Sequence, residues 1–255
     1  MTEPSIFQSF VLGALQGLAE FLPVSSSAHL ALAPWALGWE EPGLAFDVAL
    51  HVGTLVALLG YFRQEWISLV RAALSIVVDR NVETPEQQRV LFLVIATIPG
   101  AIAGLLLEKQ AETIFRAPAL TAVALMIMGA VLWVVDSVAP RARRMHDMTW
   151  RDALLIGCAQ AFALIPGVSR SGATITAGRA LRLDRENAAT FSFMMSMPII
   201  AAAAILKVPK ALHETGLTPS LMVGVGTAAL SSAIAISVLL RFVRSRGFGV
   251  FAVYR

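Results

Sequence analysis

Apolar residues along this chain gather in stretches long enough to cross a lipid bilayer, which takes about 20 mostly apolar residues in a helix. Four stretches qualify, at 44–62, 90–107, 118–136 and 220–243, and a shorter fifth lies at 190–206. Two more, 6–33 and 153–176, are interrupted by Pro, Gly, Ser and a charge. Irregular backbone at membrane depth is tolerated only where protein or water satisfies it. The pattern therefore predicts two re-entrant helix–loop–helix hairpins among membrane-spanning helices.

The two interrupted segments resemble each other when the chain is shifted by 144 residues. Three predicted spans separate them, and an odd number inverts the second copy. We therefore expect an all-α polytopic membrane protein with an inverted-topology repeat, two re-entrant hairpins and about five to six transmembrane helices. Residues 1–255 form a single membrane domain, with repeat one at about 6–107 and repeat two at about 118–255. The matched pairs are Gln16 with Gln160, Val24 with Val168, Ser25 with Ser169, and Ser27 with Ser171.

Composition supports lipid as the solvent, because 57% of residues are hydrophobic, only 15% are charged, and mean hydropathy is +0.72. A soluble domain is nearer one quarter charged. The net charge of +3 comes from basic residues grouped between apolar runs, and no nucleic-acid motif accompanies them. By the positive-inside rule, the loop from Arg63 to Arg89 and the loop before Trp150 face the cytoplasm.

The first interrupted segment carries residues suited to acid–base and nucleophilic chemistry. Gln16 and Glu20 are four apart and share a helix face. Pro23 ends that helix, and three serines and His29 follow. An ionisable group inside a membrane segment is costly and marks a functional candidate. The alternative is that Glu20 caps an interfacial helix while the serines satisfy loop backbone.

The second interrupted segment, Pro166 to Thr174, carries residues suited to anion binding. Its glycines permit close backbone approach, and Arg170 is a lone guanidinium at membrane depth. A planar guanidinium and the N–H groups of a helix start together bind phosphate well. The alternative is a helix-breaking turn whose arginine reaches the interface.

Together the segments suit phosphoryl transfer, where positioning and charge neutralisation supply most of the catalysis. A lipid-linked phosphate is the natural substrate for a site in a membrane. The alternative is a transporter or flippase of an anionic polyprenyl lipid, since inverted repeats with broken helices also build transporters. A transporter would use Arg170 but would not need a serine nucleophile beside the base Glu20.

Gln16-x-x-x-Glu20 followed by FLPVSSSAH, and PGVSRSGAT at 166–174, resemble the undecaprenyl-diphosphate phosphatase family of the bacitracin-resistance type. FDVALHVGTLVALL at 46–59 and the closing FGVFAVYR are similar to that family too. The resemblance implies a multi-pass protein of the bacterial inner (plasma) membrane whose site opens to the periplasmic or outer side. It implies hydrolysis of undecaprenyl diphosphate to the monophosphate, which recycles the carrier for cell-wall synthesis and confers bacitracin resistance.

The resemblance also implies roles for individual residues. Ser26 is the candidate nucleophile, and His29 is a general acid–base or a rival nucleophile. Glu20 is a base or a metal-linked carboxylate for Mg²⁺ or Ca²⁺. Arg170 clamps the phosphates. The substrate-binding set is Gln16, Ser25, Ser27, Ser169, Ser171 and Thr174. Expected partners are undecaprenyl diphosphate, membrane lipids and a possible homodimer, with no nucleic acid.

Two features depart from the resemblance. Gln16 stands at a position that is Glu or Gln in the family, so Glu20 is the only metal ligand we name. Family members usually continue past Tyr-Arg with another apolar helix, so we expect either a further helix after Arg255 or a member that lacks it.

Asp47, in the stretch 44–62, either faces the site or begins a helix.

Overall fold

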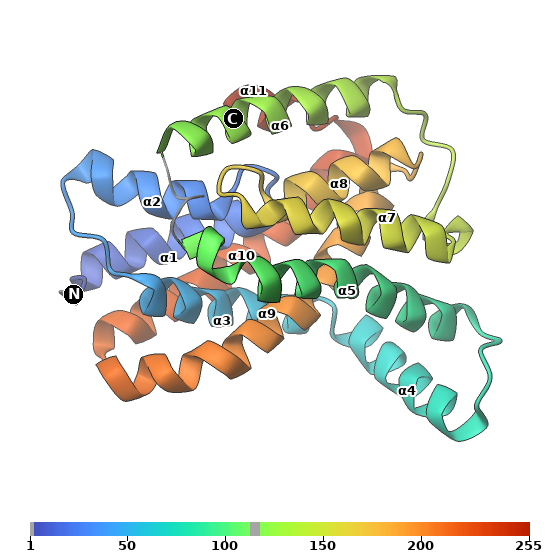
Figure 1. Ribbon diagram of the computed structural model, residues 1–255, viewed down its shortest axis with the longest axis horizontal. Helices are drawn as coiled ribbons and strands as arrows, with labels where there is room; N and C mark the ends of the chain where they lie inside the picture. The colour runs from blue at the N-terminus through green and yellow to red at the C-terminus, as the bar shows by residue number, and fades with distance from the viewer. Residues whose placement is uncertain (1–2, 113–117) are drawn as a thin grey trace.

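The computed structural model describes residues 3–112 and 118–255, and that part of the chain is helical apart from turns and one isolated bridge between Arg143 and Leu183 (Figure 1). The helices are α1 Ile6–Phe21, α2 Ser26–Leu37, α3 Leu44–Tyr61, α4 Arg63–Asp79, α5 Pro85–Glu112, α6 Pro118–Val138, η2 Met145–Asp147, α7 Trp150–Ala161, η3 Phe162–Leu164, α8 Arg170–Ala180, α9 Arg185–Thr215, α10 Pro219–Ser245 and α11 Gly249–Tyr254.

Four of the described helices are long and apolar enough to cross a membrane: Pro85–Leu107, Pro118–Val138, Arg185–Pro209 and Pro219–Ser245. Their lipid-facing positions are strongly exposed, as at Leu105 (77%) and Ile205 (74%). Extensive exposed apolar surface of this kind is typical of helices that contact a membrane or a protein partner. The prediction of an all-α, multi-pass membrane protein is confirmed.

The prediction of a membrane span at 44–62 followed by a loop is wrong in detail. The chain bends by 83° between α3 and α4, and the two helices reach spanning length and hydropathy only as a pair. Residues 63–79 are helical, although they were expected to be part of a loop. The arginines at 63 and 71 lie within α4, because charges spaced along an otherwise apolar helix do not interrupt it. Figure 1 shows α4 diverging from the other helices.

Both interrupted segments are broken helices, as predicted. The first break separates α1 from α2, and the second separates η3 from α8. Ser25 and Ser169, 144 residues apart, precede α2 and α8 with φ of 74° and 69°. Non-glycine residues rarely adopt positive φ, and such strain concentrates at functional sites. The same positive φ at the end of both breaks supports the division of the chain into two repeats. That division stays a prediction.

Helix packing also relates positions that are 144 residues apart. α1 packs on α10, and α7 packs on α5. A Cβ added at Gly13 would collide with the backbone carbonyl of Gly224 in α10, and one at Gly157 would collide with that of Ala96 in α5. The two glycines are again 144 residues apart. Small residues let membrane helices approach this closely, so each re-entrant arm lies directly against a spanning helix.

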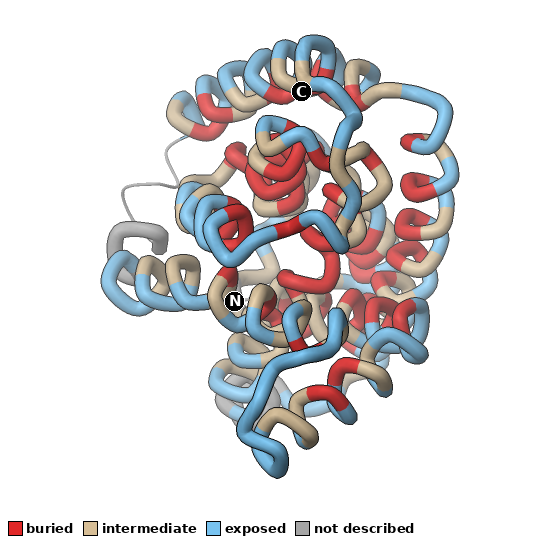
Figure 2. The backbone as a smooth tube through the Cα atoms, turned by 90° about the vertical axis from the view of Figure 1, so that its right-hand side faces the viewer, coloured by how far each residue is buried: buried red, intermediate tan, exposed pale blue. Residues whose placement is uncertain are grey.

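Buried residues gather in the middle of the molecule, and the outer turns of the helices are exposed (Figure 2). One core cluster joins Phe21 at the end of α1 to Phe193 of α9, whose rings meet edge to face with centroids 5.1 Å apart. The first break is therefore anchored to a long spanning helix.

A buried ion network fixes the far end of α8. Asp136 of α6 accepts hydrogen bonds from Arg179 (3.0 Å), from Arg185 (2.7 and 2.8 Å) and from the Phe248 amide (2.9 Å). Arg179 is fully buried. Since α8 carries Arg170 at its other end, this network positions one side of the site described next.

Candidate active site

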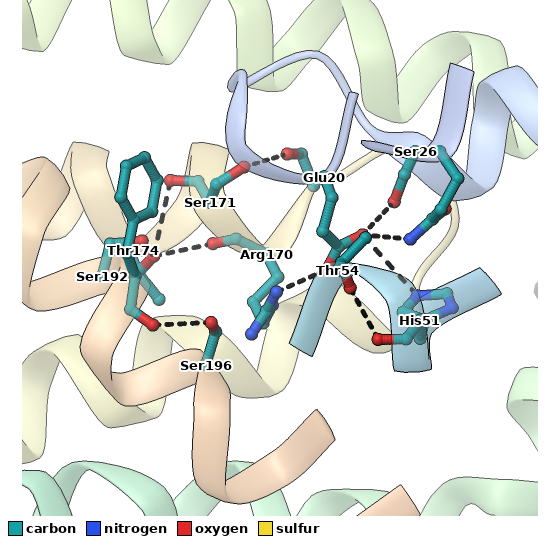
Figure 3. A network of polar contacts seen from close by, with 12 residues as sticks. Glu20, Ser26, His51, Thr54, Arg170, Ser171, Thr174, Ser192 and Ser196 are labelled. Carbon is teal, nitrogen blue, oxygen red and sulfur yellow. Dashed lines mark hydrogen bonds and ion pairs between the residues drawn. The ribbon is translucent and has the colours of Figure 1, made fainter. Parts of the chain in front are cut away.

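Glu20 is the centre of the polar network in Figure 3. It lies in the last turn of α1 and is 7% exposed. Its Oε2 accepts hydrogen bonds from Gln16 Nε2 at 3.0 Å and from Ser26 Oγ at 2.6 Å. Its Oε1 forms an ion pair with Nη2 of Arg170. Residues 150 positions apart thus meet at one carboxylate, and the two breaks form a single site.

Two helices begin at this site. Ser26 is the first residue of α2, and Arg170 is the first residue of α8. A cavity of about 160 Å³ lies between them, lined by Glu20, Ser25, Ser26, Ser27, His51, Ala163, Ser169 and Arg170. Helix N-termini carry partial positive charge and attract phosphate. Nη1 of Arg170 is buried and, within residues 3–112 and 118–255, has no hydrogen-bond partner. The cavity is therefore suited to an anion.

The hydroxyls of the second break shape the site in different ways. Ser169 Oγ lines the cavity and accepts a hydrogen bond from the Gly172 amide at 3.1 Å, capping α8. Ser171 Oγ donates to the Leu22 carbonyl at 3.2 Å, across to the first break. Thr174 donates to the Arg170 carbonyl at 2.8 Å and lies 2.6 Å from Ser192 Oγ of α9. Ser171 and Thr174 therefore hold the backbone that carries Arg170.

His29 lies on α2, and its two ring nitrogens contact other groups than Glu20. Nδ1 is 2.8 Å from the Ser25 carbonyl, and Nε2 is 2.8 Å from the Tyr254 hydroxyl. The two rings stack, with centroids 5.6 Å apart and planes 8° apart. A carbonyl oxygen only accepts, so Nδ1 is the donor in the contact with Ser25. The role of His29 as acid–base or nucleophile stays a prediction.

His51 of α3 is a site residue that the sequence reasoning missed. Its Nε2 lies 3.6 Å from Glu20 Oε2, and its Nδ1 is 2.7 Å from the Asp47 carbonyl. The available signal was an ionisable residue inside an apolar stretch, which by itself suggests function. Asp47 is in the first turn of α3 and also lines a cavity of about 350 Å³ with Ser27 and His51.

The divalent cation implied by the resemblance can be tested against the donor atoms present. In the described part of the chain, no three His, Cys, Asp or Glu residues are grouped to hold a metal by themselves. Glu20 offers one carboxylate, and the neighbouring Gln16 has a buried Oε1 without a hydrogen-bond partner among the described residues. Mg²⁺ is often held by one or two carboxylates together with substrate phosphates. The donor set fits a cation whose coordination the substrate completes.

Comparison with known proteins agrees with this geometry. Residues 9–255 match the family model described as bacitracin resistance protein BacA. A relative from Gemmatimonas aurantiaca, named undecaprenyl-diphosphatase, is 58% identical over 251 residues, covering 98% of this chain and 94% of the relative. Relatives of the same name from Pelotomaculum thermopropionicum and Moorella thermoacetica are 49% and 48% identical, each over 98% of this chain and 93% and 94% of their own lengths. The chain belongs to the bacitracin resistance protein BacA family.

Proposed function

We propose that this protein is an integral membrane phosphatase that hydrolyses undecaprenyl diphosphate to undecaprenyl phosphate and inorganic phosphate. The names of its relatives support the substrate. The single observation that carries the proposal is the meeting of Ser26, Glu20 and Arg170, which come from two distant helix breaks.

In the proposed reaction, Ser26 is the nucleophile and Glu20 is its base. Ser26 Oγ attacks the terminal phosphorus while its proton passes to Glu20 Oε2, the atom to which it already donates a hydrogen bond. The bond from that phosphorus to the bridging oxygen breaks, and undecaprenyl phosphate leaves. Water then attacks the phosphoserine phosphorus and breaks its bond to Ser26 Oγ. Oγ regains the proton held by Glu20, and the phosphate leaves with the oxygen and a proton of the water.

Arg170 binds the phosphate oxygens as the negative charge on them shifts. Its ion pair with Glu20 holds the guanidinium in place before substrate arrives. Nη1, which has no partner in the described structure, is free to donate to a phosphate oxygen. A divalent cation, Mg²⁺ or Ca²⁺, bound through Glu20 and Gln16, would neutralise phosphate charge.

An apolar cavity provides space for the first part of the lipid chain. About 210 Å³ in volume, it lies beside Glu20, His51 and Arg170. Its other walls are apolar residues of α3 and α9: Val48, Ile199, Ile200, Ala203 and Ala204. Phosphate and hydrocarbon thus have adjoining compartments, as a lipid diphosphate requires.

By the same proposal, the protein resides in the bacterial inner membrane, and the site opens to the periplasmic or outer side. Hydrolysis there returns the lipid carrier to peptidoglycan synthesis. Extra enzyme would consume the diphosphate that bacitracin sequesters, which accounts for resistance.

The test is phosphate release from undecaprenyl diphosphate by the purified protein, beside a measurement of lipid movement in vesicles. The proposal predicts one phosphate per lipid consumed. Lipid movement without phosphate release would instead support the transporter.

A further inference from the structure

The last two residues of the chain contact both helix breaks. α11 packs on α6 (Figure 1) and brings Tyr254 and Arg255 to the site. The Tyr254 hydroxyl bonds His29 Nε2 at 2.8 Å, although the tyrosine is 65% exposed. Neither residue belongs to the reacting groups named above.

The Arg255 guanidinium bonds backbone carbonyls from both breaks. Nη1 donates to the Pro23 carbonyl of the first break at 3.2 Å. Nη2 donates to the carbonyls of Gly167 at 2.5 Å and Val168 at 2.8 Å in the second break. Chain breaks leave carbonyls without helical partners, and such groups are costly to bury unsatisfied. One side chain thus satisfies carbonyls from both halves of the protein.

The Arg255 guanidinium restricts how the carbonyl groups of the two breaks can be arranged. A guanidinium is planar and presents its donors in a rigid fork, so three bonds fix both the spacing and the orientation of the groups they join. Burial lowers the pKa of Arg255 to about 10, which leaves it charged at neutral pH. Gly172 lies against the same guanidinium, because a Cβ there would meet Nη1 at 2.5 Å.

We propose that Arg255 is a positioning residue, whose guanidinium holds the two breaks at the spacing where Ser26, Glu20 and Arg170 meet. Tyr254 acts beside it by holding His29 and, through it, the start of α2. The inference rests on the proposed phosphatase activity for its kinetic consequence. The bracing itself can be tested without that activity.

The kinetic test compares Arg255→Ala and Arg255→Lys with wild type, in phosphate release from undecaprenyl diphosphate. A misplacement of about 1 Å can cost about 10²-fold in rate, so we expect kcat of Arg255→Ala to fall about 100-fold. Arg255→Lys keeps the charge but loses the fork, and we expect a fall of about tenfold. Arg246→Ala, which removes an exposed arginine just before α11, is the control and keeps wild-type activity.

Guanidinium rescue separates positioning from plain loss of stability. Guanidinium chloride at tens of millimolar should restore part of the activity of Arg255→Ala, whereas equal NaCl should not. A variant that had only lost stability would lose more activity in guanidinium, since guanidinium favours unfolding. Wild-type kcat in folded Arg255→Ala would overturn the proposal. If that variant does not fold, wild-type kcat in Arg255→Lys would overturn it.

Hydrogen exchange supplies the readout that needs no activity. In Arg255→Ala, or in Arg255→Lys if the former does not fold, exchange should quicken at residues 22–25 and 165–169 together but not in Arg246→Ala. Unchanged exchange in both breaks would overturn the bracing. A wild-type protein that releases no phosphate would refute the proposed function instead, and the exchange result would still decide the bracing.

Discussion

Replacing Glu20 by glutamine removes the negative charge on which the described site converges. The amide keeps the size of the side chain but cannot take the Ser26 proton. General base catalysis is worth about 10²–10⁴-fold in rate. With Ser26 already hydrogen-bonded at 2.6 Å, we expect kcat to fall about 10³-fold, equivalent to about 4 kcal/mol of barrier.

The same substitution should also raise KM, because the Glu20 carboxylate holds the Arg170 guanidinium in place and would bind the divalent cation. Removing one partner of a buried pair also destabilises the fold, by about 3–5 kcal/mol, so thermal unfolding must show that the variant is folded at the assay temperature.

The assay is phosphate release from undecaprenyl diphosphate in detergent, across a range of substrate concentrations. Glu65→Gln is the matched control, because Glu65 is exposed in the first turn of α4. A folded Glu20→Gln with kcat within about fivefold of wild type, against the range for general bases, would refute Glu20 as the base.

Three further predictions follow from the same contacts. His51→Phe should lower kcat/KM at least about tenfold, because it removes the polar group beside Glu20; His146→Gln, at an exposed position, is its control, and equal activity would exclude His51 from the site. Asp136→Asn should destabilise the protein by about 3–5 kcal/mol in thermal unfolding, because Arg179 and Arg185 lose their shared counter-charge; exposed Asp79→Asn should not, and equal melting temperatures would contradict the role of the network. Chelation should abolish phosphate release and Mg²⁺ or Ca²⁺ should restore it; full activity in chelator would remove the cation from the account.

The sequence predicted the general architecture because lipid imposes strong patterns. Long apolar stretches identified the four described spanning helices, and polar interruptions identified both breaks. The paired positions Ser25 and Ser169 also share a positive φ, which the sequence did not predict. The bend at Phe62 was not predicted, because α4 combines arginines with an apolar face.

At the site, local motifs were more informative than distant contacts. The segments around Glu20 and Arg170 were found because each concentrates polar residues within a few positions. His51 and Arg255 contribute one side chain each, from elements whose sequence shows no polar cluster, and only tertiary packing brings them to the breaks. His29 was predicted from proximity in sequence, but its contact with Tyr254 depends on a helix 225 positions away.

The most direct test of the central claim, that two helix breaks build one phosphatase site, is phosphate release by wild type, Ser26→Ala and Arg170→Ala. Ser26 directly follows the first break, and Arg170 directly follows the second. We expect one phosphate per undecaprenyl diphosphate for the wild type, and a loss of at least about 10²-fold for each folded variant. Wild-type rates in either folded variant would contradict the central claim.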